Sequence, residues 1–260
     1  MNAQSDQGPP AGMSRREWRD RGRSDAAADA ETTPPSTTPS TPSPADAPVP
    51  LADLLGSTSS TEPSSRLTIL TVCTGNICRS PLAEVLLRAE LEPLGVRVHS
   101  AGTHALVGHG MPEPALDLAV QEGADPEVAA AHQARYLVEP LLADADLILT
   151  MAREHRSHVV KMMPNRLRRT FTVREFARLA STLTDEEARA AAEAAGDSPR
   201  ERFAAVLRAV NDQRGITPSS GDEDDVIDPY RRSRETYARS AAELTPALVE
   251  VERIVRDALT

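Results

Sequence analysis

Large hydrophobic residues are scarce in the first quarter of the chain and become regular only from Leu67 onward. Residues 67–72 form a short, apolar, partly β-branched run, which is typical of a buried strand in a parallel sheet. From Leu82 onward, apolar residues recur at intervals of three and four, which predicts a helix. Ser80 is predicted as the N-cap of this helix, with Pro81 at its first position.

The alternation of strand and helix patterns continues along the chain. Short apolar runs predict strands, and periods of three and four predict helices, with strands at 96–99, 146–151 and 169–173 and helices at 114–122 and 153–162. This order predicts an α/β fold in which a parallel sheet is flanked by helices. Ligand sites in such folds lie beyond the carboxyl ends of the strands, so the loop after residue 72 is a candidate.

The C-terminal third is predicted to be helical. Residues 182–210 are rich in Ala, Glu and Arg and predict two helices, with Thr184 and Ser198 as caps. An acidic loop follows. A long helix is predicted over residues 231–258, kinked or divided at Pro246.

Residues 1–65 have a different composition from the rest. They contain ten of the 21 prolines, together with many Ala, Ser, Thr and Asp residues. Such a segment buries too little apolar surface to offset the entropy of ordering. It is therefore predicted to be a disordered tail, and the folded domain is expected over residues 66–260.

Charge and cysteine content exclude several classes of function. The net charge of −10 gives no electrostatic support for broad binding to nucleic acid or anionic membranes. No apolar run approaches the ~18 residues of a membrane span, and no signal-peptide pattern begins the chain, so we expect a cytoplasmic protein without membrane insertion. Two cysteines, Cys73 and Cys78, are too few for a disulfide scaffold and, by themselves, for a zinc site.

The loop between the first strand and the first helix reads CTGNICRS, residues 73–80. A loop of this kind points backbone N–H groups into its own concavity, and the helix dipole adds positive character. Gly75 is expected to adopt backbone angles that a side chain would obstruct, and Arg79 to grip two phosphate oxygens. The predicted phosphate-binding positions are Thr74, Gly75, Asn76, Ile77, Cys78, Arg79 and Ser80.

The same field stabilises a thiolate, which makes Cys73 the predicted nucleophile. Its in-line attack on phosphorus gives a phosphocysteine intermediate, and Ser80 donates a hydrogen bond to the thiolate when it departs. Asp228, in the sequence VIDPY, is predicted to protonate the leaving oxygen and then to accept a proton from water. Other candidate acids are interpreted as a solvated acidic loop: Asp222, Asp224 and Asp225.

These residues resemble the low-molecular-weight protein-tyrosine phosphatases. The resemblance is carried by VCTGNICRSP at residues 72–81, SAGT at 100–103, ADLILTM at 145–151 and DPY at 228–230. It implies a four-stranded parallel sheet flanked by helices, neither metal nor other cofactor, and the roles of Cys73, Arg79 and Asp228 derived above. It also implies phosphotyrosine proteins as substrates, a bacterial tyrosine kinase among them.

The resemblance assigns further roles to individual residues. Asn76 is similar to an asparagine that holds the loop in shape, and His132 to its supporting partner, with packing as an equal alternative. Cys78 corresponds to a cysteine that forms a reversible disulfide with the nucleophile. Leu106 stands in the segment where animal members place a large aromatic residue, which leaves Tyr230 as the aromatic wall for the substrate ring.

Compared with the compact family fold, residues 181–221 are expected to be an insertion. The insertion is expected to form either an interface for a partner or a helical hairpin that covers the edge of the sheet. Arsenate reductases of related fold are excluded because they need cysteines downstream of Cys78. Protein-arginine phosphatases remain an alternative, although they carry threonine where Ile77 stands. A non-catalytic phosphate-binding module and a metal site at His155 and His158 are weaker alternatives.

Overall fold

The computed structural model describes residues 66–218 and 221–260. The predicted tail, residues 1–65, lies outside the described residues. Four strands form the sheet: β1 (Thr68–Cys73), β2 (Arg97–Gly102), β3 (Leu147–Thr150) and β4 (Thr170–Thr172). All neighbouring pairs are parallel, and the order across the sheet is β2-β1-β3-β4. The four-stranded parallel sheet expected from the sequence is therefore confirmed.

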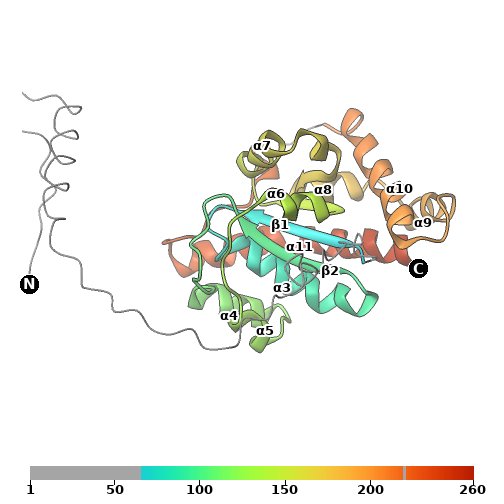
Figure 1. The fold of residues 1–260 in the computed structure, drawn as a ribbon. Coiled ribbons are helices and arrows are strands. Elements are labelled where there is room, and N and C mark those ends of the chain that lie inside the picture. Colours follow the sequence, from blue (N-terminus) through green and yellow to red (C-terminus); the bar gives the residue numbers. More distant parts are fainter. Residues whose placement is uncertain (1–65, 219–220) are drawn as a thin grey trace, which may run out of the picture. The chain divides into compact units, whose positions relative to one another are not determined.

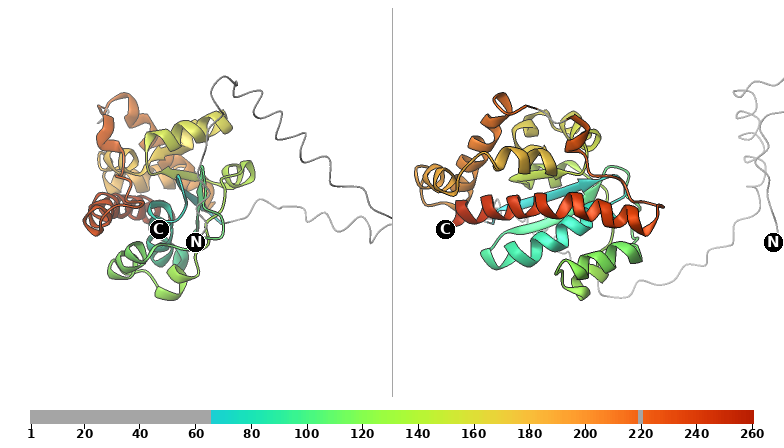
Figure 2. Two further views of the ribbon diagram at one scale, coloured as in Figure 1. Left: turned by 90° about the vertical axis from the view of Figure 1, so that its left-hand side faces the viewer. Right: turned by 180° about the vertical axis from the view of Figure 1, so that it is seen from behind.

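Helices cover both faces of the sheet (Figure 1). Their bounds are α3 Arg79–Leu91, η2 Glu92–Leu94, α4 Glu113–Gln121, α5 Pro126–Ala130, α6 Glu139–Asp144, α7 Arg153–Met162, η3 Pro164–Arg169, α8 Val173–Ala180, α9 Asp185–Glu193, α10 Pro199–Asp212, η4 Gln213–Gly215, η5 Gly221–Asp224 and α11 Arg234–Leu259. The long α11 lies across the sheet beside α3, on the face seen from behind (Figure 2).

Alternate residues of β1 point into two separate hydrophobic cores. Ile69 and Cys73 belong to the larger core, which also contains the apolar residues of α3 and α8 to α11. Leu70 and Val72 belong to a smaller core that includes Leu142 of α6 and contacts α7. Because β1 is buried on both faces, apolar residues point to both of them, and the only polar side chains of the strand are the buried Thr68 and Thr71.

The sequence predictions around α8 and α11 need correction. The helix α8 was not predicted, because a capping box at Thr172 starts it directly after β4, within the run interpreted as strand alone. The last helix begins at Arg234 rather than 231, since Arg231 has a left-handed φ of 57°. Pro246 does not divide α11, whose buried side chains continue on both sides of it, among them Leu244 and Leu248.

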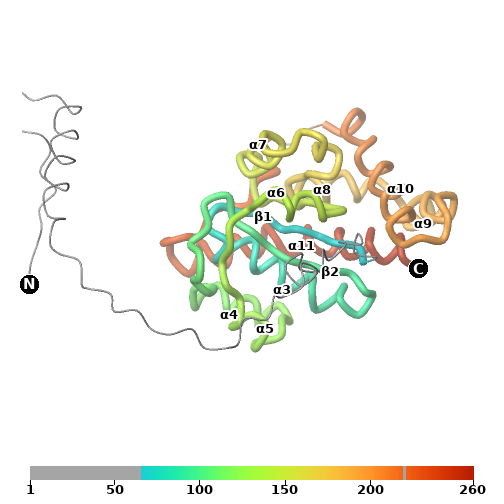
Figure 3. Tube along the Cα trace, in the orientation of Figure 1, coloured from blue at the N-terminus to red at the C-terminus, as the bar shows by residue number. Residues whose placement is uncertain are grey.

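The two helices expected between residues 182 and 210 are present as α9 and α10. Thr184 caps α9 in a full capping box, as predicted, whereas Ser198 occupies the N-cap position of α10 without a side-chain hydrogen bond. Both helices pack against α11, at the end of the molecule that contains the C-terminus (Figure 3). Among the described residues, no helix is long and apolar enough to cross a membrane.

Candidate active site

Cys73 ends β1 and lies almost fully buried in the loop that leads to α3. Its Sγ accepts a hydrogen bond from the backbone N–H of Asn76 at 3.2 Å. The Oγ of Ser80 lies 3.0 Å from the same sulfur. Two donors therefore converge on Cys73, an arrangement that stabilises negative charge on the sulfur.

Ser80 does not cap the helix, contrary to the sequence prediction. α3 begins two residues earlier than predicted, at Arg79, and its N-cap residue Cys78 makes no side-chain cap bond. The hydroxyl of Ser80 instead accepts a hydrogen bond from Nδ2 of Asn76 at 3.0 Å, which leaves its own proton for Cys73. The predicted contact between Ser80 and the nucleophile is thus present, although the cap is not.

Asn76 is fully buried and holds the loop in a left-handed conformation, with φ of 54°. Its Nδ2 also donates to Oγ of Ser100 at 2.7 Å, and its Oδ1 accepts from the backbone N–H of Arg135 at 2.9 Å. Nε2 of His132 lies 2.8 Å from the carbonyl oxygen of Asn76. These contacts are those expected of an asparagine that shapes the loop and of a histidine that supports it.

Glu84 extends this network and was missed in the sequence. It is buried on α3, accepts a hydrogen bond from Oγ of Ser100, and lies 3.7 Å from Nδ1 of His132. A carboxylate among the apolar positions of a helix is the sequence signal that points to such a role, because buried acids require partners.

Arg79 is buried, with a side chain 4 % exposed, and links the loop to the distant segment around Asp228. Its Nη1 donates to the backbone carbonyl of Val226 at 3.1 Å, and its Nη2 pairs with Oδ2 of Asp228 at 3.1 Å. Asp228 is half exposed, so its carboxyl faces both Arg79 and solvent. The sequence-predicted nucleophile loop and acid are therefore brought together.

A cavity of about 120 Å³ opens above the cysteine loop. Its lining contains both residues expected as walls from the sequence, Leu106 and Tyr230. Tyr230 is partly exposed, and Leu106 is partly buried against the core. The full set of lining residues is Cys73, Thr74, Gly75, Ile77, Cys78, Arg79, His104, Leu106, Asp228 and Tyr230.

The alternative acids lie outside this lining. Asp224 is buried and pairs with Nη2 of Arg178 at 3.0 Å, so its interpretation as part of a solvated loop is wrong. A buried carboxylate here anchors the loop through two hydrogen bonds from one guanidinium. Asp222 and Asp225 both pair with Arg153.

The glycine that the loop conformation requires is Gly102 rather than Gly75. Gly75 has no left-handed φ, and a Cβ added there meets Cγ1 of Ile77 at an ordinary 3.5 Å. A Cβ on Gly102 of β2 would lie 2.5 Å from the carbonyl oxygen of Thr74. The prediction for Gly75 is therefore wrong, because the tight approach occurs where β2 contacts the loop, which sequence distance hides.

Cys78 contributes to the cavity lining but is almost fully buried, with its Sγ 3.6 Å from the hydroxyl of Tyr237 on α11. Burial raises the pKa of the Cys78 thiol to about 11, so the group is protonated near neutral pH. Cys73 and Cys78 are both free thiols. The disulfide between them remains a prediction.

His155 of α7 was interpreted only as a weak metal ligand, yet it contacts the cysteine loop. Its Nε2 lies 2.8 Å from Oγ1 of Thr74, and the ring is buried. Burial, followed by the charge of Arg79, lowers the pKa of His155 to about 3, so the ring is neutral. His158, its proposed co-ligand, instead meets the ring of His104 edge-on. Across residues 66–218 and 221–260, no three potential ligand side chains gather as a metal-binding group.

Comparison with known families gives one match over most of the folded region. The model for low molecular weight phosphotyrosine protein phosphatases matches residues 68–213, more than half of the chain. The phosphatase Etp of Escherichia coli is 46 % identical over 96 residues, which are 37 % of this chain and 62 % of Etp. The matched segment thus spans less than two thirds of that relative.

Two further relatives differ in their named activity. The probable low molecular weight protein-tyrosine-phosphatase EpsP of Ralstonia solanacearum is 40 % identical over 108 residues, 42 % of this chain and 71 % of EpsP. A protein-arginine-phosphatase of Bacillus subtilis is 37 % identical over 111 residues, again 42 % of this chain and 71 % of the relative. A solved protein tyrosine phosphatase superposes with a TM-score of 0.50 and 27 % identity, covering 72 % of this chain and 95 % of that one.

Proposed function

Because the chain belongs to the low molecular weight phosphotyrosine protein phosphatase family, we propose that it hydrolyses phosphotyrosine in proteins through a phosphocysteine intermediate. One observation carries the proposal: the Cys73 sulfur, with donors from Asn76 and Ser80, lines the same cavity as Arg79 and Asp228. Nucleophile, phosphate-binding cation and acid are the three groups that the reaction needs.

In the first step, the sulfur of Cys73 forms a bond to phosphorus while the bond to the phenolic oxygen breaks. Arg79 and the loop amides donate hydrogen bonds to the phosphoryl oxygens, where negative charge accumulates. A phosphoryl group on Arg79 competes with Asp228 for the guanidinium, which frees the carboxyl to protonate the leaving oxygen. The products of this step are the free tyrosine hydroxyl and phosphocysteine.

In the second step, water attacks phosphorus and the bond to sulfur breaks. Asp228, now ionised, accepts the proton of the attacking water, and inorganic phosphate leaves. The Ser80 hydroxyl lies 3.0 Å from the sulfur and stabilises the departing thiolate. Asn76, His132 and Glu84 act through the loop rather than on the substrate. His132 bonds the backbone carbonyl of Asn76, the Asn76 side chain bonds Ser80 and Arg135, and Glu84 contacts Ser100 and His132.

The cavity supports an aromatic substrate. Its apolar lining includes Ile77 and Leu106, and Tyr230 supplies an aromatic ring against which the tyrosine ring of a substrate would pack. The alternative, an arginine phosphatase, is represented among the relatives by the Bacillus subtilis protein. The apolar residue at position 77 favours the tyrosine substrate, because arginine-directed members carry threonine there.

Residues 66–260 are proposed as the phosphatase domain, with 181–221 as its helical insertion. We further propose a cytoplasmic location and, among the phosphotyrosine substrates, a bacterial tyrosine kinase. Dephosphorylation of an autophosphorylated kinase of this type, followed with a phosphotyrosine antibody, tests that assignment. Persistence of the signal at enzyme concentrations that consume a free phosphotyrosine peptide would overturn it.

The decisive experiment is hydrolysis of p-nitrophenyl phosphate with EDTA and reductant present, by the wild type and by Cys73→Ser. We expect turnover that the substitution abolishes, at an unchanged melting temperature. A folded wild type without turnover would support a non-catalytic phosphate-binding module. The rates of hydrolysis of peptides carrying phosphotyrosine or phosphoarginine then distinguish the two activities. Ile77→Thr is expected to lower the ratio of the phosphotyrosine rate to the phosphoarginine rate.

A further inference from the structure

A second and larger cavity, of about 310 Å³, lies at the opposite edge of the sheet. Asp146, which lines it, directly precedes β3, and its carboxylate binds the backbone N–H of Thr68 at the start of β1. Cys73 stands at the other end of β1. Five residue steps along a strand, at ~3.3 Å each, separate the two sites by about 17 Å.

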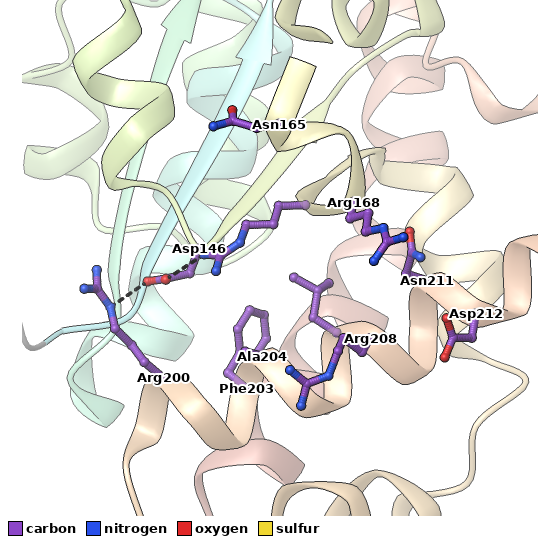
Figure 4. A pocket seen from close by; sticks show the side chains of 11 residues that line it. Asp146, Asn165, Arg168, Arg200, Phe203, Ala204, Arg208, Asn211 and Asp212 are labelled. Atoms are coloured by element: carbon purple, nitrogen blue, oxygen red, sulfur yellow. Dashed lines mark hydrogen bonds and ion pairs between the residues drawn. The ribbon is translucent and has the colours of Figure 1, made fainter. Parts of the chain in front are cut away.

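Arginines dominate this cavity, which is formed by η3 and α10 (Figure 4). Arg168 and Arg169 come from η3, and Arg200 and Arg208 from α10. The carboxylates in the lining are Asp146 and Asp212. Asp144, outside the lining, also pairs with Arg200 at 4.0 Å. Four guanidinium groups against these three carboxylates still leave the cavity a positive excess, although the whole chain is acidic.

The buried carboxylate of Asp146 holds two of the arginines in place. Oδ1 of Asp146 accepts a hydrogen bond from Nη1 of Arg169 at 3.2 Å, and Oδ2 accepts from Nε of Arg200 at 3.1 Å. Asp146 is almost fully buried, whereas both arginines are partly exposed. Each therefore keeps further N–H donors for a ligand, and little side-chain entropy is lost when one binds.

The other two arginines have no protein partner among the described residues. Arg168 and Arg208 are exposed, and neither makes an ion pair or a hydrogen bond there. In Figure 4, Arg168 lies toward Asn211 at the end of the cavity away from Arg200, with Arg208 and Phe203 between the two ends. Charged donors thus surround a floor of α10 residues that includes Ala204 and Leu207.

We propose that this cavity binds a small molecule that carries phosphate groups. A guanidinium group donates two parallel hydrogen bonds to two oxygens of one phosphate. The oxygens of a phosphate point in several directions, so one phosphate can accept hydrogen bonds from several of these arginines at once. A planar carboxylate offers only two oxygens. The volume, about 310 Å³, suits a small ligand rather than a protein surface. Because α10 lies in the proposed insertion, the site is additional to the phosphate loop.

Pyrophosphate is the probe, and isothermal titration gives the number of sites. We expect two sites in the wild type, one of them at the cysteine loop. Arg168→Ala/Arg208→Ala should remove the second site or weaken it by at least about tenfold. Arg79→Met should remove only the first, and the triple variant should bind no pyrophosphate. Melting temperatures identify any variant that fails to fold.

Lys161→Ala/Arg256→Ala is the charge control, because it removes the same charge from two exposed residues outside the cavity; it also removes the ion pair between Arg256 and Glu90. It is expected to retain both sites. One site in the wild type, lost with Arg79→Met and unchanged in Arg168→Ala/Arg208→Ala, would overturn the proposal. Citrate that binds the Arg79→Met protein as tightly as pyrophosphate would overturn the assignment to phosphate.

Discussion

Gly102 offers a sharp test of how the sheet shapes the phosphate loop. In Gly102→Ala the new Cβ would lie 2.5 Å from the carbonyl oxygen of Thr74 and 3.0 Å from the backbone nitrogen of Asn76. Both are backbone atoms, so no flexible side chain can move aside. Gly102 has no left-handed φ, and alanine adopts its backbone conformation freely. The whole effect is therefore steric.

The magnitude follows from the displacement required. The carbonyl of Thr74 must move by roughly half an ångström or more to reach an ordinary contact, and overpacking of this kind costs about 1–3 kcal/mol of stability. For a domain of this size, that cost lowers the melting temperature by about 2–4 °C per kcal/mol. Because the displaced backbone is the phosphate cradle, we expect kcat/KM for p-nitrophenyl phosphate to fall by about a hundredfold.

Gly110→Ala is the matched control. Its added Cβ comes no closer than 3.5 Å to the carbonyl oxygen of His132, an ordinary contact on an exposed segment. Both variants are measured for kcat/KM and for thermal unfolding. Wild-type kinetics and melting temperature in Gly102→Ala would refute the argument, as would an equal loss of activity in Gly110→Ala.

Three other perturbations test separate parts of the site. Asp228→Asn is expected to slow phenyl phosphate more than p-nitrophenyl phosphate, because a good leaving group needs less protonation; equal losses would remove Asp228 as the acid. Burial lowers the pKa of His155 to about 3 and that of His99 to about 4, below the ordinary 6.5. The unfolded chain then binds more protons than the folded one below pH 6.5, so the free energy of unfolding, from urea titrations, should fall as the pH drops from 6.5 toward 4. His99→Gln/His155→Gln should flatten that decline, and an unchanged slope would contradict the assignment. Cys78→Ser should lose recovery of activity by dithiothreitol after peroxide treatment, whereas the wild type regains it; equal recovery would exclude the predicted disulfide.

Much of the fold was predictable because its signals are local. The apolar run of β1, the cap at Thr184 and the periodic helices depend on neighbours in sequence, and these predictions are confirmed. The cap at Ser80 was wrong for a physical reason. Its hydroxyl has two competing partners, Cys73 and Asn76, whose positions depend on the path of the loop.

The missed residues of the site depend on contacts between distant segments. Glu84 contacts His132, and Thr74 contacts His155, although each pair is far apart in the sequence. The spacing of hydrophobic residues does not predict such contacts. The close approach of Gly102 to Thr74 is of the same kind. Motif spacing therefore identified the groups proposed to react, while the residues that hold them required the pairing of strands and helices in space.

The contacts of Arg79 have a consequence for how the protein is made. This buried guanidinium meets the carbonyl of Val226 and the carboxylate of Asp228, about 150 positions later in the chain. When only the residues of the sheet have been synthesised, the chain therefore contains the nucleophile, Cys73, but not the acid, Asp228. Arg79 then lacks both partners, and α11 has not yet covered the core. Catalytic competence is therefore expected to arise only after the segment around Asp228 has been synthesised and has folded against Arg79.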